Sequence, residues 1–401
     1  MRILLIHDWN PGRGGSEAYV GWLHDELLAR GHQVHLLTGD AGSAGDGRAT
    51  SIARAGRSLP ARAVYQIFNL DAWRQARRAA RDLAPDVVHL HHHAYQLSGS
   101  VALALRHLPI VASIHDYKNV CPLGTKALPD GRICTQPQGI ACLQGCLGPS
   151  HWLRDQVRYQ VLDSALRKSH HRIVYSRHIQ SVLQQHGIDT ELLEYAVCQP
   201  TDSFQRRPAP APLFVYLGRL EPEKGVATLL TAFARLHETH PEARLRIVGD
   251  GSQRRPLEQL CQQLSIDSQV DFKGWQPAER LSEWLSDVWC AVAPSLMAEP
   301  FGLVAPECIL RGIPVIASRI GGFADSVTHG KTGLLFDNGN VEGLLQCLLE
   351  FVSRNTFPDL TCDPEATSTL RQLLHPDRHL SRLESLYRDL SHDSQRRSPT
   401  T

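Results

Sequence analysis

Two glutamates in the second half of the chain are candidates for binding a polar ligand. Glu299 and Glu307 bound the run EPFGLVAPE, with seven residues between them. An apolar run at 290–293 predicts a strand before them, and the residues after Gly302 favour a helix. Ionised carboxylates accept hydrogen bonds from hydroxyl groups, and the N–H groups at the start of a helix bind phosphate. For two acids alone, a dipole-stabilised acid at a helix start and a solvated helix residue are the commoner explanation.

Two cations follow the predicted strand at 213–217. Arg219 and Lys224 come within seven residues of its end, so both are expected at the carboxyl edge of a sheet. Fixed cations at such a place stabilise a diphosphate as charge develops on it. The alternative is a surface basic pair beside Glu221 and Glu223.

Histidines end two predicted strands in the first half. His115 follows the run 110–114 and precedes Asp116, where it could orient a polar ligand or transfer a proton. A core histidine held by Asp116 is the competing interpretation. A second group is interpreted as cleft lining rather than as a metal site. It comprises His89, His91, His92 and His93.

The fold class follows from short apolar runs that alternate with helical segments. The runs lie at 3–7, 34–37, 87–90, 110–114 and 173–175, and then at 213–217, 245–248, 270–272, 291–293, 314–317 and 334–336. Near-continuous apolar strands separated by helices predict parallel sheets covered on both faces. The sequence therefore predicts an α/β protein with two Rossmann-like, doubly wound domains that face a cleft.

Proline density sets the domain boundaries. We expect a first domain over 1–198, a proline-rich linker over 199–212 and a second domain over 213–375. A last helix over 376–391 could cross back to the first domain. The polar residues 392–401 are expected to be disordered.

The composition excludes some functions. Among 401 residues, 42 basic side chains nearly balance 41 acidic ones, which gives no reason to expect nucleic-acid binding. No apolar run reaches the roughly 18–20 residues of a membrane-spanning helix. The first ten residues lack the features of a signal peptide, so we expect a cytoplasmic protein with reduced cysteines.

The ordered motifs resemble those of the retaining family-4 glycosyltransferases, which have the GT-B fold. The matching segments are GGSE at 14–17, GH at 31–32, HD at 115–116, LGRLEPEKG at 217–225, VGDG at 248–251, EPFGLVAPE at 299–307, GG at 321–322 and GKTG at 330–333. This resemblance covers nearly the whole chain. Pro306 departs from it, because the family more often has an aliphatic residue there.

The resemblance implies a role for each matching residue. Arg219 and Lys224 would neutralise the donor diphosphate, Glu299 and His115 would contact the donor sugar, and Glu307 would bind the ribose hydroxyls. His115, Glu299, Arg219 and Lys224 are thus the expected catalytic residues. Further donor-binding residues are expected at Gly14, Gly15, Gly249, Phe301, Gly302, Leu303 and Val304.

The implied activity is transfer of a sugar from a nucleotide-diphosphate sugar to an unidentified acceptor, with retention of configuration. Glycan, glycolipid or cell-surface polysaccharide synthesis would be its setting, and the acceptor would be a sugar, a lipid-linked group or a small molecule. The chemistry would need no cofactor. Two alternatives are a nucleotide-sugar epimerase on the same fold and a catalytically silent sugar-nucleotide-binding protein.

Four cysteines lie within 26 positions in the region 117–150: Cys121, Cys134, Cys142 and Cys146. They could form a closed tetrahedral zinc site, and the alternatives are buried thiols or a disulfide. The segment YKNVCP at 117–122 resembles a subset of the same transferases that carry a cysteine-rich insertion.

An arginine-rich stretch occupies 53–81. Arg54, Arg57, Arg62, Arg74, Arg77, Arg78 and Arg81 belong to it. The last four share one helical face, opposite Trp73, Ala76, Ala80 and Leu83. This face could bind anionic lipid and place the enzyme at the inner membrane surface, although a solvated arginine face is the simpler interpretation.

Overall fold

The computed structural model describes residues 1–10, 14–39, 49–51, 64–128, 133–197, 204–277 and 280–397. Parts of several predictions lie outside these residues: the glycine-rich turn at 11–13, Arg54, Arg57, Arg62, positions 199–203 of the linker and the last four residues of the tail. The chain forms two compact units. The first unit comprises Met1–Lys126, Thr135–Leu193 and His379–Thr401, and the second comprises Ala127–Cys134 and Glu194–Arg378.

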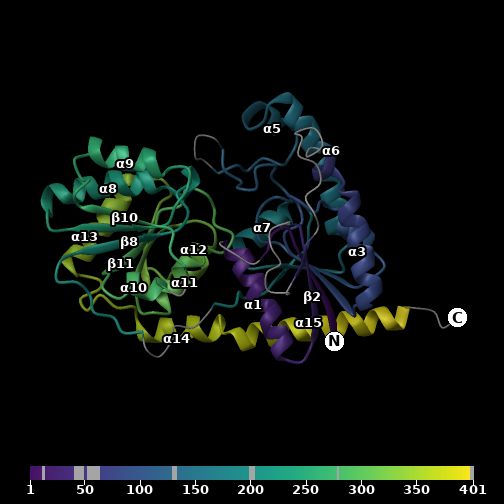
Figure 1. Cartoon of the computed structure of the whole chain (residues 1–401). Helices are drawn as coiled ribbons and strands as arrows, with labels where there is room; N and C mark the ends of the chain where they lie inside the picture. The colour runs from purple at the N-terminus through teal and green to yellow at the C-terminus, as the bar shows by residue number, and fades with distance from the viewer. Residues whose placement is uncertain are drawn as a thin grey trace. The chain divides into compact units, whose positions relative to one another are not determined.

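A seven-stranded parallel sheet forms the centre of the first unit (Figure 1). Its strands are β1 (Arg2–His7), β2 (Gln33–Thr38), β3 (Ala49–Ser51), β4 (Val87–Leu90), β5 (Ile110–Ser113), β6 (His171–Val174) and β7 (Glu191–Leu192). They lie in the order β3-β2-β1-β4-β5-β6-β7. The five long strands match the predicted runs. The edge strands β3 and β7 escaped prediction because three and two residues make no apolar run.

Helices cover this sheet. They are α1 (Gly15–Ala29), α3 (Leu70–Leu83), α4 (Ser100–Ala104), α5 (Ile140–Gly145), α6 (Pro149–Arg167), α7 (Arg177–Gln185) and α15 (Pro376–Arg397). Gly14 occupies the N-cap position of α1, and Ser16 lies inside the helix, where its hydroxyl donates to the Glu17 carboxylate over 2.9 Å.

The second unit repeats the architecture with six parallel strands in the order β10-β9-β8-β11-β12-β13. The strands are β8 (Leu213–Leu217), β9 (Arg244–Val248), β10 (Val270–Gly274), β11 (Cys290–Ala293), β12 (Val315–Ser318) and β13 (Gly333–Phe336). The helices are η1 (Pro222–Lys224), α8 (Val226–Thr239), α9 (Arg254–Gln263), α10 (Leu281–Leu285), α11 (Val304–Ile309), α12 (Gly322–Ser326), α13 (Val341–Ser353) and α14 (Pro364–Leu373). Apolar side chains of the strands and of α8, α9 and α13 form one core cluster.

Each sheet reverses its strand order at one place. In the first unit the reversal lies between β1 and β4, and in the second it lies between β8 and β11. The chain therefore leaves these neighbouring strands toward opposite faces, which opens a crevice beyond their carboxyl ends. The two-domain prediction of doubly wound parallel sheets is confirmed, and each sheet has one place where a ligand would bind.

The end of the chain differs from the prediction. α15 continues to Arg397, so the expectation of disorder from residue 392 is wrong as far as 397. The segment 391–397 contains no glycine or proline that would stop a helix. From His379 onward the helix belongs to the first unit, where Tyr387 is fully buried and its hydroxyl lies 2.5 Å from His89 Nδ1.

The described part of the predicted linker is fastened to the second unit. The N–H groups of Arg207 and Ala209 donate to the carbonyl oxygens of Ser286 and Asp287 over 2.7 and 2.8 Å. The Arg206 guanidinium donates to four further carbonyl oxygens, those of Gly312, Val288, Trp289 and Leu360. Residues 204–212 are thus part of the second unit rather than a free connection.

This arrangement predicts a large effect for Arg206 and a small one for its neighbour. Arg206→Met leaves at least three carbonyl oxygens without their charged donor, and each such hydrogen bond is worth about 1.5–3 kcal/mol. We expect the second unit to lose several °C of thermal stability, followed by the fluorescence of its tryptophans. Arg207→Met is the control, because Arg207 is exposed and its guanidinium donates to the nearby Gln205 side chain rather than to backbone carbonyl oxygens of the described residues. Equal effects of the two substitutions would contradict this explanation.

Candidate active site

An ion pair lies at the switch point of the second sheet. Lys224 Nζ is 2.7 Å from Glu299 Oε1, and the hydroxyl of Ser295 donates to the same oxygen. Lys224 ends η1 after β8, whereas Ser295 and Glu299 follow β11. Because β8 and β11 are neighbours, their following loops meet beyond the sheet. The structure thus brings together two of the predicted catalytic residues.

Glycines allow these loops to approach so closely. Gly225 has φ +68°, and a Cβ atom there would clash with the carbonyl oxygen of Pro294. On the other side, the N–H of Gly322 donates to the carbonyl oxygen of Glu299 over 2.8 Å. Gly321, with φ +60°, packs against the Glu299 backbone so tightly that a side chain has no room. Glu299 is therefore fixed through its backbone and through both partners of its carboxylate.

Arg219 has a different environment. Its side chain is 64% exposed and lies 3.4 Å from Glu223 Oε1, while its carbonyl oxygen accepts a hydrogen bond from Tyr216 over 2.7 Å. The backbone is held, but the guanidinium lies at the surface beside an acid, as the alternative interpretation expected. The structure accordingly fixes Lys224 and leaves the Arg219 side chain solvated.

Glu307 lies in the first turn of α11, and Pro306 does not displace that helix. Pro306 is its third residue, where the missing N–H breaks no helical hydrogen bond. The N–H of Glu307 donates to the carbonyl oxygen of Leu303 over 3.0 Å. Burial raises the pKa of the Glu307 carboxyl to about 7, and Arg311 lowers it only in part. This acid is therefore poorly solvated and has one charged neighbour.

The remaining predicted donor-binding residues of the second unit have packing roles. The Phe301 ring stacks on Tyr195 at 4.9 Å, and Gly302, with φ +77°, faces the Phe323 ring. Leu303 and Val304 open α11 and are half-buried. A Cβ atom at Gly249 would clash with the carbonyl oxygen of Gly218, so close backbone packing alone requires glycine there.

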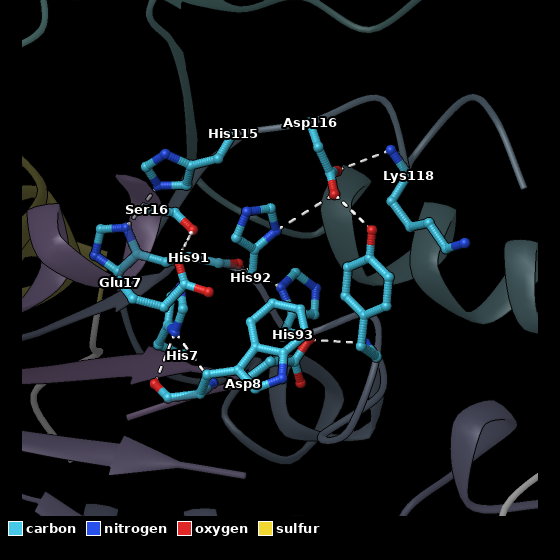
Figure 2. Close-up of polar contacts among 12 residues, drawn as sticks. His7, Asp8, Ser16, Glu17, His91, His92, His93, His115, Asp116 and Lys118 are labelled. Carbon is cyan, nitrogen blue, oxygen red and sulfur yellow. Dashed lines mark hydrogen bonds and ion pairs between the residues drawn. The ribbon is translucent and has the colours of Figure 1, made fainter. Parts of the chain in front are cut away.

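Four histidines gather at the carboxyl end of the first sheet (Figure 2). His7 ends β1, while His91 and His92 follow β4 and His115 follows β5. His91 Nδ1 lies 3.0 Å from His115 Nε2, and the His92 and His115 rings are 5.3 Å apart. Since β1 and β4 flank the switch point, this group lies where a ligand of the first unit would bind.

Asp116 does not hold His115, contrary to the competing interpretation. Its carboxylate accepts hydrogen bonds from the Tyr95 hydroxyl at 2.9 Å and the Lys118 N–H at 2.8 Å, and lies 3.6 Å from His92 Nδ1 (Figure 2). His115 instead lies at hydrogen-bond distance from His91. The predicted cleft-lining group comprised His89 and His91 to His93. Three of these side chains, His89, His91 and His93, are at most 6% exposed, which is more deeply buried than cleft-lining residues would be.

Burial keeps the imidazoles of His7, His89, His91 and His115 neutral at pH 7. It lowers the pKa of His7 to about 4 and that of His89 to about 3. The pKa values of His91 and His115 also lie well below the ordinary value, because burial and the neighbouring histidines disfavour the protonated, charged form of each ring. Neutral imidazoles offer one donor and one acceptor each, which determines what they can bind.

The surroundings of Gly14 and Gly15, at the start of α1, give little support for their predicted donor-binding role. A Cβ atom at Gly14 would clash with the carboxylate of Glu17, and Gly15 is exposed at the start of the helix. Glu17 therefore places a negative charge near this helix start. An incoming phosphate would have to displace it.

The four cysteines do not assemble into the predicted site. Over the described ranges, which omit 129–132 of this region, no three histidine, cysteine, aspartate or glutamate side chains are placed to hold a metal ion. Cys142 and Cys146 lie one turn apart on α5 and its end, Cys121 is buried in the preceding segment, and Cys134 groups with the second unit. Within the described residues these thiols therefore form no group with metal-ligand geometry, and the zinc site stays a prediction.

Several residues of both sites were missed from the sequence. Ser295 pairs with Glu299, and its position two residues after a strand was the available signal. Tyr19, Tyr175 and His379 surround His115, but they come from elements far apart in the chain. Tyr19 and His379 lie on helices and Tyr175 follows β6, and single residues at such positions carry no local pattern that indicates such a contact.

Comparison with known proteins gives matches in both halves of the chain. Residues 13–195 match the family model described as Glycosyltransferase Family 4, and residues 200–359 match that described as Glycosyl transferases group 1. Together the two glycosyltransferase models cover most of the chain, although neither alone covers half of it. The solved structures described next share the two-domain GT-B fold of this chain.

Two curated proteins and two solved structures represent the matches. Glycogen synthase of Mycobacterium tuberculosis is 37% identical over 160 residues, 40% of this chain and 37% of that protein. D-inositol 3-phosphate glycosyltransferase of Corynebacterium urealyticum is 29% identical over 68% of this chain and 64% of that protein. The chain thus spans less than two thirds of either protein.

Among the structures, sucrose-phosphate synthase of Thermosynechococcus elongatus has a TM-score of 0.76 at 23% identity, covering 97% of this chain and 98% of that one. Anabaena HepE in complex with UDP-glucose has a TM-score of 0.69 at 17% identity, covering 96% and 99%.

The raised pKa of Glu307 predicts how stability changes with pH. The folded-state pKa of about 7 exceeds the ordinary 4.5, so this carboxyl stabilises the fold most below pH 4.5 and loses that contribution as pH rises through 7. Glu307→Gln should therefore raise the melting temperature at pH 8 but not at pH 4.5. The gain should not exceed roughly 3 kcal/mol.

The control is Glu283→Gln. Arg280 lowers the pKa of the exposed Glu283 carboxyl, so this substitution should cost stability as pH rises rather than add it. A Glu307→Gln melting temperature that runs parallel to the wild-type curve between pH 4.5 and 8 would show that Glu307 has an ordinary pKa.

Proposed function

We propose that the protein transfers a sugar from a nucleotide-diphosphate sugar to an acceptor hydroxyl. The observation that carries the proposal is the Lys224–Glu299 ion pair, which joins a phosphate-binding cation and a hydroxyl-binding acid at the switch point of the second sheet. The domain matches support it. So does the similarity to HepE, whose structure contains UDP-glucose.

The ion pair supplies both partners that such a donor needs. A diphosphate carries more charge than one carboxylate and would compete with Glu299 for Lys224. Arg219, with its exposed guanidinium, would add a second cation. Glu299 would then accept a hydrogen bond from a sugar hydroxyl while Ser295 and the Gly322 N–H keep it in place. As the glycosidic bond breaks, charge grows on the leaving diphosphate, and the two cations stabilise it.

Other roles in the proposal rest on the resemblance. Glu307 is proposed to bind the ribose hydroxyls, and His115 is proposed to contact the donor sugar. Retention of configuration is inherited from the family in the same way. We propose no metal for the chemistry, since Arg219 and Lys224 would neutralise the diphosphate. The acceptor class is a sugar, a lipid-linked group or a small molecule in glycan, glycolipid or cell-surface polysaccharide synthesis.

We also propose peripheral binding to the inner membrane surface through α3. Arg74, Arg77, Arg78 and Arg81 are exposed on this helix. Its buried face differs from the prediction: Ala72, Ala76 and Ala80 are buried, while Trp73 is half-buried beneath the Arg77 guanidinium at 4.8 Å. Val64, Phe68 and Leu70 add exposed apolar side chains just before and at the start of α3. Among the described helices, none is long and apolar enough to cross a bilayer.

Activity assays test the ion pair. A panel of nucleotide sugars is screened by thermal shift, and nucleotide release is then measured with and without candidate acceptors. Lys224→Ala and Glu299→Ala should each lower kcat by roughly 10²–10³-fold, because each removes a group that stabilises the transition state. The wild-type rate should survive EDTA.

Arg235→Ala is the matched control for these variants. It breaks an exposed ion pair of 2.8 Å with Glu342 in the same unit and should leave transfer unchanged. Lys224→Ala activity within threefold of wild type would refute the site. Turnover without any acceptor would favour the epimerase, and nucleotide-sugar binding without either reaction would favour a silent binding protein.

Vesicle co-sedimentation tests the membrane contact. Wild type should bind vesicles that contain anionic lipid, and less so at high salt. Each cation near such a surface contributes about 1 kcal/mol, so the double variant Arg74→Glu, Arg78→Glu should bind at least 10-fold more weakly. The control is the charge-matched pair Arg235→Glu, Arg255→Glu on exposed positions of the second unit. Equal loss in both double variants would mean that net charge alone, and not this face, governs binding.

A further inference from the structure

His91 and His115 face each other at hydrogen-bond distance. His91 Nδ1 and His115 Nε2 lie 3.0 Å apart, a normal hydrogen-bond length. Burial and the surrounding histidines keep the pKa values of both rings well below the ordinary value, so both are neutral. One of the two facing nitrogens therefore donates and the other accepts, and the direction of this hydrogen bond sets the tautomer of both rings.

The other nitrogen of His91 decides the direction. His91 is 2% exposed, and its Nε2 is buried without a hydrogen-bond partner among the residues that the structure describes. Buried N–H groups without a partner are rarer than buried acceptors without one. The less costly arrangement leaves Nε2 as a bare acceptor and puts the hydrogen of His91 on Nδ1.

We propose that His91 fixes the tautomer of His115 by donating from Nδ1 to His115 Nε2. His115 then carries its own hydrogen on Nδ1. A group that meets this nitrogen meets a hydrogen-bond donor, which suits a hydroxyl or carbonyl oxygen and cannot accept a proton. His91 is thus a positioning residue. The catalytic consequence rests on the proposed function, in which His115 contacts the donor sugar.

The surroundings hold the His115 ring in the orientation that this bond requires. Its plane stacks on Tyr175, with centroids 5.0 Å apart and planes 29° apart. The Tyr175 hydroxyl is itself 2.7 Å from Ser113 Oγ and 3.2 Å from the Tyr19 hydroxyl. A ring flip of His115 would have to break its contact with His91 while the ring stays stacked on Tyr175. Tyr175 cannot move aside easily, because its hydroxyl contacts Ser113 and Tyr19.

Two substitutions of His91 separate the tautomer from packing. His91→Asn introduces an amide that can still donate, so this variant should preserve the Nδ1–H form of His115. His91→Asp introduces a carboxylate that only accepts, so this variant should move the hydrogen of His115 to Nε2. The tautomer is measured by two-dimensional NMR of ¹⁵N-histidine-labelled protein, with the His115 signals assigned by their loss in His115→Gln.

The wild-type and His91→Asn spectra should show Nδ1–H at His115, and the His91→Asp spectrum should show Nε2–H. Nε2–H in the wild type would overturn the proposal, as would an unchanged tautomer in a folded His91→Asp protein. Folding is checked by nucleotide-induced thermal shift. If His91→Asp does not fold, the wild-type spectrum still decides.

Activity provides the second measurement. His91→Asn should retain kcat within a few-fold, whereas His91→Asp should lower it on the order of 10²-fold, the usual cost of one misplaced donor. A protein without transferase activity that still shows Nδ1–H would refute the proposed function and leave the tautomer assignment intact. Equal losses of kcat in both variants, with His115 unchanged, would indicate a packing role only.

Discussion

All strands of a parallel sheet end at the same edge, and this constraint decides where the polar side chains of the protein lie. The residues that follow β1, β4 and β5 must meet beyond the first sheet, and those that follow β8 and β11 must meet beyond the second. Where the strand order reverses, the connections leave toward opposite faces and do not cover that edge. The histidine group and the Lys224–Glu299 pair both lie at such places, although no sequence pattern relates them.

The histidine group and the Lys224–Glu299 pair differ in the charge state of their buried polar side chains. In the first unit, burial keeps the imidazoles neutral, so they interact by directed hydrogen bonds without net charge. In the second unit, Lys224 and Glu299 remain an ion pair, and burial raises the pKa of the nearby Glu307 carboxyl. Hydrogen-bond donors on a ligand would stabilise the ionised form of such a buried carboxyl. Its contribution to the free energy of ligand binding is therefore larger than that of a solvated carboxylate.

Much of this could be predicted from the sequence, because strands and glycines leave local patterns. Apolar runs located eleven strands, and the order of the motifs around Gly225, Gly321 and Glu299 indicated one site. The partner of His115 could not be predicted, since Asp116 is its neighbour in sequence and His91 its neighbour in space. Closeness in sequence also suggested a cluster of the four cysteines, whereas Cys142 and Cys146 lie on α5 and its end, and Cys121 and Cys134 lie outside that helix.

The docking of α15 has a consequence for how the chain is divided. His379 and Tyr387 hydrogen-bond to Tyr19 and His89, so the last helix completes the polar interior of the first unit. The second unit is therefore, in topological terms, largely an insertion between residues 193 and 379 of the first. A chimaera that exchanges donor domains between relatives should be joined at both of these points. A single crossover in the linker would pair the first unit with a foreign terminal helix and leave buried phenol and imidazole groups without partners.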